Sequence, residues 1–193
     1  RDRRGRHHVG RSDLGRPVYD LLGGKVHDVL RCGFENPSAA ERMTIEAKLR
    51  EFQRTQPLQG VAVAAPTVIP IHFHVITTNS GAGNVLDSQL DSQIAVLNAA
   101  YAASGFQFVK QGYSRTANTT WYNGCAQSSI ERQIRKSIAV DPAHTFNVYT
   151  CGLGDGLLGR ATFPSYYPEN SFMHGVVILN ASVNLGSANH YNE

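Results

Sequence analysis

The sequence predicts an α/β fold with a twisted, mostly parallel sheet, preceded by a separate N-terminal segment. From residue 66 onward, stretches rich in β-branched residues alternate with stretches whose apolar residues recur at helical spacing. The order strand–helix–strand–helix–strand favours parallel strands joined by right-handed crossovers, with both helices expected on one face of the sheet. Small residues at 57–66 form a linker, which divides the chain into residues 1–62 and 63–193.

The N-terminal segment combines an irregular stretch with one helix. Residues 1–33 hold scattered Arg and His, and five glycines precede residue 25. Ser38 and Glu41 form a capping-box signature before a helix with regularly spaced apolar residues. The helix should end near Thr55, because Pro57 disfavours a helical residue before it.

The C-terminal domain contains five candidate strands and two candidate helices. Asp87 can cap the first helix and Gly105 can end it. Ser128 and Glu131 mark the start of the second helix, which Pro142 stops. The expected strands are 67–77, 106–113, 145–150, 156–163 and 175–181, and the two expected helices lie between Asp87 and Gly105 and between Ser128 and Pro142.

Composition argues against two function classes. Hydrophobic residues make up 41% of the chain and charged residues 17%, as in a globular protein. No apolar run approaches the ~18 residues of a membrane helix, so we expect no membrane association. Residues 1–60 hold 12 Lys and Arg against 8 Asp and Glu, while residues 61–193 hold 6 against 7. Because the basic stretch at 1–6 lacks interleaved aromatics, we expect no nucleic-acid binding, and nothing in the sequence specifies an oligomeric state.

One glycine-rich stretch matches a dinucleotide-binding pattern without its structural context. Gly154, Gly156 and Gly159 follow a predicted strand as G-x-G-x-x-G. A dinucleotide site needs a helix to begin there, whereas Pro164 and Pro168 argue against a helix. We therefore interpret this stretch as a turn.

His72 and His74 lie at positions i and i+2 of a predicted strand and so share one face. Such a pair can bind a metal, and a metal-dependent hydrolase with these two ligands is one hypothesis. No third ligand lies near them in sequence. The favoured interpretation is therefore structural, with two hydrogen-bonded imidazoles beside a helix.

Three cysteines leave one unpaired if the other two form a disulfide. Cys32 lies between Arg31 and Gly33, and a neighbouring Arg favours the thiolate form that binds metals. On local sequence alone, a metal-binding thiolate and a buried or disulfide-bonded cysteine are equally supported.

Two stretches match the Asn-x-Ser/Thr pattern of N-glycosylation. Asn118 begins the first, which we place in a loop, and Asn180 begins the second, at the end of an apolar strand. The second match is more readily explained by chance.

Several segments occur in an order that is typical of one enzyme family. They are Arg31-Cys32-Gly33 before a charged helix, the strand 69–76, the helix and strand at 97–101 and 105–108, and the segments 146–150, 158–164 and 175–178. In order and spacing they resemble the pappalysin family of metzincin zinc peptidases, including its secreted microbial members. The resemblance implies a metzincin-like (zincin) N-terminal subdomain in residues 63–193, preceded by a propeptide in residues 1–62.

The resemblance implies a latent, secreted metalloendopeptidase that hydrolyses peptide bonds of proteins or peptides with a zinc-activated water. The family's zinc-binding motif, H-E-x-x-H-x-x-G-x-x-H, is expected beyond Glu193, so no catalytic residue is assigned and this chain alone should be inactive. Zinc is the implied cofactor, with most ligands outside this chain, and calcium is a second candidate ion.

Three sets of residues acquire roles from the resemblance. Cys32 would bind the zinc as a cysteine switch until cleavage within residues 55–66 removes the propeptide. Cys125 and Cys151 would form a disulfide, which suits an extracellular compartment. An extended substrate would bind along Leu158, Gly159, Arg160, Ala161 and Thr162. The alternative hypothesis is a non-catalytic binding or inhibitory module with the same fold.

Overall fold

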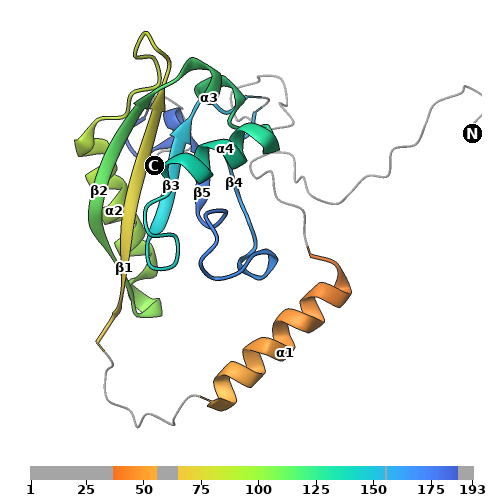
Figure 1. The fold of residues 1–193 in the computed structure, drawn as a ribbon. Coiled ribbons are helices and arrows are strands. Elements are labelled where there is room, and N and C mark those ends of the chain that lie inside the picture. Colours follow the sequence, from red (N-terminus) through yellow and green to blue (C-terminus); the bar gives the residue numbers. More distant parts are fainter. Residues whose placement is uncertain (1–36, 56–64, 155, 187–193) are drawn as a thin grey trace, which may run out of the picture.

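The computed structural model describes residues 37–55, 65–154 and 156–186. At its centre lies a five-stranded sheet with the strand order β2-β1-β3-β5-β4 (Figure 1). The pairs β1–β2, β1–β3 and β3–β5 are parallel, and β4 is antiparallel to β5. The strands are β1 (Thr67–Thr77), β2 (Phe106–Ala117), β3 (Phe146–Cys151), β4 (Gly159–Ala161) and β5 (Val176–Leu179).

Helices precede the sheet and form its crossovers. The α-helices are α1 (Ala39–Thr55), α2 (Asp87–Tyr101), α3 (Thr119–Gly124) and α4 (Ser128–Ile138), and short 3₁₀ turns occupy η1 (Ala102–Ser104), η2 (Pro164–Tyr166) and η3 (Asn180–Ser182). None of the described helices is both long and apolar enough to cross a membrane. The α/β class and the mostly parallel sheet predicted from the sequence are confirmed.

The helices α2 and α4 lie on opposite faces of the sheet, which corrects the expectation that both would cover one face. Leu90 of α2 packs in a core with Phe73 of β1. Ile134 of α4 packs in a second core with Ile76 of the same strand. Because Phe73 and Ile76 are an odd number of residues apart in β1, their side chains point to opposite faces.

Strand order explains this placement. β2 and β3 flank β1 on opposite sides. The crossover from β1 to β2 therefore runs across the sheet in one direction, and that from β2 to β3 runs back in the other. Right-handed crossovers in opposite directions place their helices on opposite faces. The number of crossovers can be read from the sequence, whereas the strand order cannot.

Several helix boundaries depend on local hydrogen bonds. The predicted capping box of α1 is present, with the Ser38 N–H donating to the Glu41 carboxylate at 2.8 Å and the Glu41 N–H donating to the Ser38 hydroxyl at 3.3 Å. The other two predicted helix starts are shifted by one residue. Leu86 precedes α2 as its N-cap in place of Asp87, and Gln127 precedes α4, so that Ser128 lies inside the helix.

Two further elements differ from the sequence-based expectation. β2 continues to Ala117, beyond the predicted end at residue 113. Helix α3 follows directly, capped by Asn118, whose side-chain oxygen accepts a hydrogen bond from the Trp121 N–H at 3.0 Å. The glycine-rich stretch is a turn, as predicted. The element that begins at Gly159 is the strand β4 and not a helix.

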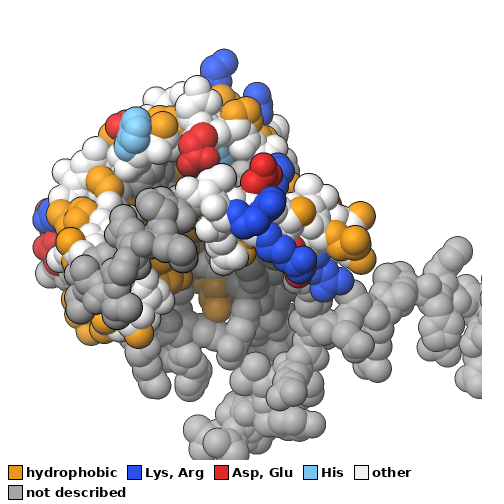
Figure 2. Space-filling view, turned by 90° about the horizontal axis from the view of Figure 1, so that it is seen from below, with side chains coloured by type: hydrophobic (Ala, Val, Ile, Leu, Met, Phe, Trp, Pro, Cys, Tyr) orange, Lys and Arg blue, Asp and Glu red, His pale blue; other side chains and the backbone are white. Residues whose placement is uncertain are grey.

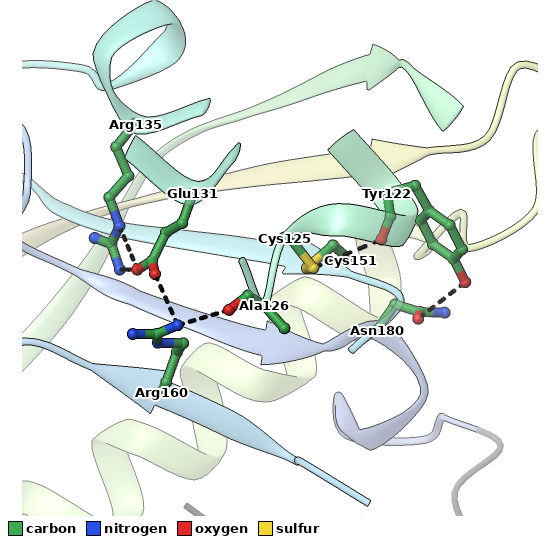
Figure 3. Close-up of a disulfide and its surroundings, with 8 residues drawn as sticks. All are labelled: Tyr122, Cys125, Ala126, Glu131, Arg135, Cys151, Arg160 and Asn180. Carbon is green, nitrogen blue, oxygen red and sulfur yellow. Dashed lines mark hydrogen bonds and ion pairs between the residues drawn. A yellow bond between two sulfur atoms is a disulfide. The ribbon is translucent and has the colours of Figure 1, made fainter. Parts of the chain in front are cut away.

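A disulfide joins Cys125 and Cys151, the pair implied by the resemblance (Figure 3). Cys125 directly follows α3, and Cys151 ends β3. Both side chains are buried in the core on the α4 side of the sheet. The bond therefore fixes the α3–α4 layer to the central strand.

Replacing both cysteines, Cys125→Ala and Cys151→Ala, should lower the free energy of unfolding. The two residues are 26 positions apart, and the chain-entropy relation gives about 3–4 kcal/mol for a loop of that length. Urea unfolding of the double variant and the wild type measures the difference. A loss below about 1 kcal/mol would contradict a stabilising role for this disulfide.

Candidate functional site

The strand β4 forms one edge of the sheet and includes residues that the sequence analysis assigned to substrate binding. Gly159 pairs with Ile178, and Arg160 pairs with Val177. The next pair along is Leu158 with Leu179, whose N–H donates to the Leu158 carbonyl at 2.8 Å. Hydrogen-bonded and non-hydrogen-bonded pairs alternate in an antiparallel ladder. The main chain of Arg160, two residues after Leu158, therefore also bonds to β5.

The same alternation turns the backbone N–H and C=O of Gly159 and Ala161 toward the outer edge. Ala161 is exposed, and Leu158, Gly159, Arg160 and Thr162 are half-buried. Among the described residues, no strand pairs with this outer edge. An extended chain can add here as another strand through main-chain hydrogen bonds.

The Arg160 side chain does not extend along this edge. Its guanidinium donates to the Ala126 carbonyl at 2.8 Å and lies 3.3 Å from a carboxylate oxygen of Glu131 (Figure 3). Both partners belong to the α3–α4 layer. Arg160 therefore connects β4 to the helices on one face of the sheet, and its contribution to the edge comes from its main chain.

Glu131 and Arg135 complete a buried charge cluster with Arg160. The Arg135 side chain is fully buried and donates to the Glu131 carboxylate at 2.9 Å, and Glu131 is only 3% exposed. Arg135 also donates to the carbonyls of Met173 and His174, at 3.1 and 2.9 Å. The cluster thus ties α4 to β4 and to the loop that leads into β5.

Thr162 provides a second contact between β4 and that loop. Its hydroxyl donates to the Met173 carbonyl at 2.9 Å, and Arg135 donates to the same carbonyl. The loop ends at Gly175, whose φ of +107° is suited to glycine. A Cβ there would lie 2.2 Å from the Asn147 carbonyl, so the close approach of this loop to β3 also requires glycine.

Sequence reasoning did not identify Glu131 and Arg135 as important residues. Charges at i and i+4 on a helix usually form an exposed pair. The available signal was their position beside Ile134 and Ile138, on the apolar stripe of the helix. An ion pair within the apolar stripe indicates burial, and the structure shows that outcome.

The two histidines of β1 form a hydrogen-bonded network, which agrees with the favoured structural interpretation. His74 is 1% exposed, and its Nδ1 lies 2.9 Å from the Ser114 hydroxyl. Its Nε2 lies 2.8 Å from Oδ1 of Asn147, and His72 contacts the same Ser114 hydroxyl at 3.3 Å. The His74 ring also stacks on Tyr149, with 4.6 Å between ring centroids.

The partners of Asn147 determine which nitrogen of His74 carries the proton. The Asn147 amide group donates to the carbonyls of Val140 and Thr145, so its oxygen faces His74. Nε2 therefore donates to Asn147, and Nδ1 of the neutral ring accepts from Ser114. Burial lowers the pKa of His74 to about 4, and it also lowers the pKa of His72. Both hydrogen-bonding positions of the His74 ring are occupied.

The described residues contain no group of three or more His, Cys, Asp or Glu that could hold a metal ion. This finding gives no support to the hypothesis of a hydrolase with His72 and His74 as ligands. Cys32 and the domain boundary at residues 62 and 63 lie outside the described residues. Of the predicted site residues, the structure describes the five substrate-edge residues and the two cysteines of the disulfide.

Charged side chains are interspersed on the described surface. In the view of Figure 2, Asp and Glu side chains lie among the Lys and Arg side chains, and hydrophobic side chains are scattered between them. Of the surface pairs, Lys110 and Asp91 are 3.1 Å apart, and Arg115 and Asp87 are 2.6 Å apart. In each of these two pairs the carboxylate offsets the positive charge of its partner.

Comparison with curated proteins identifies extracellular metalloproteases as relatives. An extracellular metalloprotease of Colletotrichum graminicola is 36% identical over 168 residues, covering 83% of this chain and 58% of the relative. Another, from Arthroderma gypseum, is 38% identical over 180 residues, covering 92% of this chain and 58% of the relative. The chain thus spans less than two thirds of the length of these relatives. No family model matches the chain.

Solved structures with a similar fold are those of mirolysin, from Tannerella forsythia. Mature mirolysin in complex with a cleaved peptide has a TM-score of 0.55 at 25% identity, covering 67% of this chain and 59% of that structure. A promirolysin mutant has a TM-score of 0.59 at 24% identity, covering 84% of this chain and 64% of that structure. These likenesses agree with the α/β fold described above.

Protonation of His74 should destabilise the fold at low pH. The pKa of His74 is about 4 in the folded protein and about 6.5 when unfolded, so the unfolded state binds the proton first as the pH falls. Stability from this residue is complete above pH ~6.5 and decreases by up to about 3 kcal/mol toward pH ~4. Urea unfolding at several pH values measures this loss.

The variant His74→Phe serves as the comparison, because it keeps an aromatic ring against Tyr149 and cannot titrate. Carboxylates shared by both proteins titrate alike, so their contribution cancels in the difference between the two unfolding free energies. That difference should shrink as the pH falls from 6.5 to 4. A difference that stays constant with pH would contradict the buried, neutral state of His74.

Proposed function

We propose that the whole protein is a secreted zinc metalloendopeptidase of the pappalysin type, in which β4 binds the substrate peptide. The observation that carries the proposal is the outer edge of β4, where the main-chain groups of Gly159 and Ala161 pair with no strand among the described residues. The relatives named extracellular metalloproteases support the class of enzyme. The mirolysin complex with a cleaved peptide supports a peptide or protein substrate.

The peptide would lie extended along β4, as a sixth strand of the sheet. Main-chain hydrogen bonds to Gly159 and Ala161 would supply binding that is largely independent of the substrate sequence. Alternate substrate side chains would point to the two faces of the extended sheet. Arg160 holds β4 in place through Glu131. Because the strand is already ordered, less conformational entropy would be lost when a peptide binds.

The zinc requirement rests on the resemblance and on the relatives, because the described residues do not themselves form a metal site. In a peptidase of this class, bound zinc supplies an activated water for attack on the peptide carbonyl. The described residues would contribute substrate binding and the structural support of the cleft edge. No catalytic step is assigned to any of them.

Residues 1–62 are proposed to be a propeptide, with Cys32 as the zinc-binding latch. The covered share of this chain rises from 67% in the comparison with mature mirolysin to 84% in the comparison with promirolysin. That increase supports a proenzyme-like segment before the sheet. Cleavage within residues 55–66 would separate this segment from the peptidase domain and release latency.

The variant Ala161→Pro should weaken peptide binding about tenfold. Proline removes the outward N–H of residue 161, and a net loss of about 1.4 kcal/mol corresponds to a factor of ten in affinity. The measurement is the Kd of the mature protein for an extended peptide, by fluorescence anisotropy. A peptide that binds without being hydrolysed would favour the non-catalytic binding module over the peptidase.

Ala161→Thr is the matched control, because it keeps the N–H and favours an extended backbone at an exposed position. It should bind the peptide as the wild type does. Both variants should unfold at the same urea concentration as the wild type, because the N–H of residue 161 faces the outer edge of β4 and makes no hydrogen bond to β5. Unchanged affinity in Ala161→Pro would exclude binding along β4.

The variant Cys32→Ala should make the uncleaved full-length precursor active. If the thiolate of Cys32 maintains latency, its removal releases the block without cleavage of the linker. The measurement is hydrolysis of a quenched fluorescent peptide by the precursor, with a gel to verify that it remains uncleaved. Lys48→Ala, at an exposed position of α1, is the control and should stay latent. A latent Cys32→Ala precursor would disprove the cysteine switch.

A further inference from the structure

We infer that Asn118 carries an N-linked oligosaccharide, added while the chain passes through a secretory pathway. The inference rests on the proposed function, which makes the protein extracellular. Asn118-Thr119-Thr120 matches the acceptor pattern. The structure places this pattern at the junction of β2 and α3, at one end of the sheet (Figure 1).

The hydrogen bonds of Asn118 leave one atom of its amide group free. Its side-chain oxygen accepts from the Trp121 N–H at 3.0 Å, as the N-cap of α3. Its main-chain N–H donates to the Thr77 carbonyl at 2.8 Å. Its Nδ2 has no hydrogen-bond partner among the described residues. The fold therefore uses the acceptor atom of this side chain and leaves the nitrogen, where a sugar is attached, unengaged.

Attachment of the sugar preserves the helix cap. The donor is an oligosaccharide linked through a diphosphate to a lipid. Nδ2 forms a bond to C1 of the first sugar and gives up one proton to a base of the transferase, while the bond between C1 and the diphosphate oxygen breaks and its electron pair leaves with the lipid diphosphate. The amide carbonyl is unchanged by this transfer. It can still accept from the Trp121 N–H, so the modified residue remains compatible with α3.

Asn118 itself is half-buried, and residues beside it are exposed. Thr120, the third residue of the pattern, is exposed and its hydroxyl makes no hydrogen bond among the described residues. The loop that faces the junction contains Asn79, whose N–H donates to the Thr119 hydroxyl at 2.9 Å and which is itself exposed. The junction thus lies at the surface, where a bulky polar group is tolerated.

The second pattern, at Asn180, differs from the first in its third residue, which is hydrogen-bonded within the fold. The Asn180 side-chain oxygen accepts from the Tyr122 hydroxyl at 3.4 Å (Figure 3). The hydroxyl of Ser182, its third residue, donates to the Leu179 carbonyl at 2.9 Å. Gly186 also lies close to this turn, since a Cβ there would be 2.3 Å from the Ala181 carbonyl. A sugar at Asn180 would have to fit within this packed segment.

The test uses the full chain with a cleavable signal peptide, translated in the presence of endoplasmic-reticulum microsomes. Translocation is scored by removal of the signal peptide and by protease protection. Glycosylation is scored by a gel shift that an endoglycosidase reverses. Thr120→Ala removes the pattern and leaves the Asn118 cap intact, and Thr120→Ser keeps both. Ser182→Ala removes only the second pattern.

A single glycosylation step is expected for the wild type, Thr120→Ser and Ser182→Ala, with complete loss in Thr120→Ala. A translocated wild-type chain that shows no shift would overturn the inference, as would a shift that persists in Thr120→Ala and disappears in Ser182→Ala. The translocation score distinguishes this failure from that of the proposed function, because glycosylation is judged only on translocated chains. Whether the natural protein is extracellular is tested separately, by its activity in the culture medium.

Discussion

The buried charge of Arg135 is the constraint on which the α4 side of the molecule depends. Transfer of a guanidinium out of water costs several kcal/mol unless it is neutralised and fully hydrogen-bonded. Glu131 provides the counter-charge, the loop carbonyls of Met173 and His174 accept further hydrogen bonds, and the Tyr149 ring lies 5.1 Å from the guanidinium carbon. Helix, loop and sheet must all be in place at once for this charge to be tolerated.

This requirement extends along the α4 face of the sheet to His74. Tyr149 stacks on His74, His74 donates to Asn147, and Asn147 bonds to Val140, just beyond the end of α4. The helix is therefore held in its last turn by Arg135, and the chain just beyond its end is held by Asn147. Through Tyr149, the Glu131–Arg135 ion pair is connected to the neutral imidazole of His74. Desolvation in this buried layer is the main cause of the lowered pKa of His74, and the neighbouring His72 lowers it further.

The sequence specified the local elements better than their arrangement. Eleven residues rich in β-branched side chains predicted β1 from Thr67 to Thr77, and the structure has those bounds. Helix α3 has only six residues, too few for a periodic pattern, and it was missed. Strand order, the opposite placement of α2 and α4, and the outward direction of the Gly159 and Ala161 main chain depend on tertiary pairing, which no local pattern encodes.

The two edges of the sheet differ in a way that favours β4 as the proposed binding edge. β2 is a long edge strand, but the pairing shifts at Gln111, and Lys110 and Arg115 place charges along it. Bulges and charges of this kind prevent another strand from adding to an edge. β4 is protected from aggregation by its length of three residues and by Pro164 just beyond it.

Within those three residues β4 carries no charge toward its outer edge, because the guanidinium of Arg160 is held against Glu131 and Ala126. Under the proposed function, a short, uncharged edge of this kind would accept one extended peptide. The buried charge cluster therefore has two effects on the same strand. It fixes the position of β4 in the sheet. It also holds the Arg160 side chain away from the outer edge, where that side chain would hinder the addition of another strand.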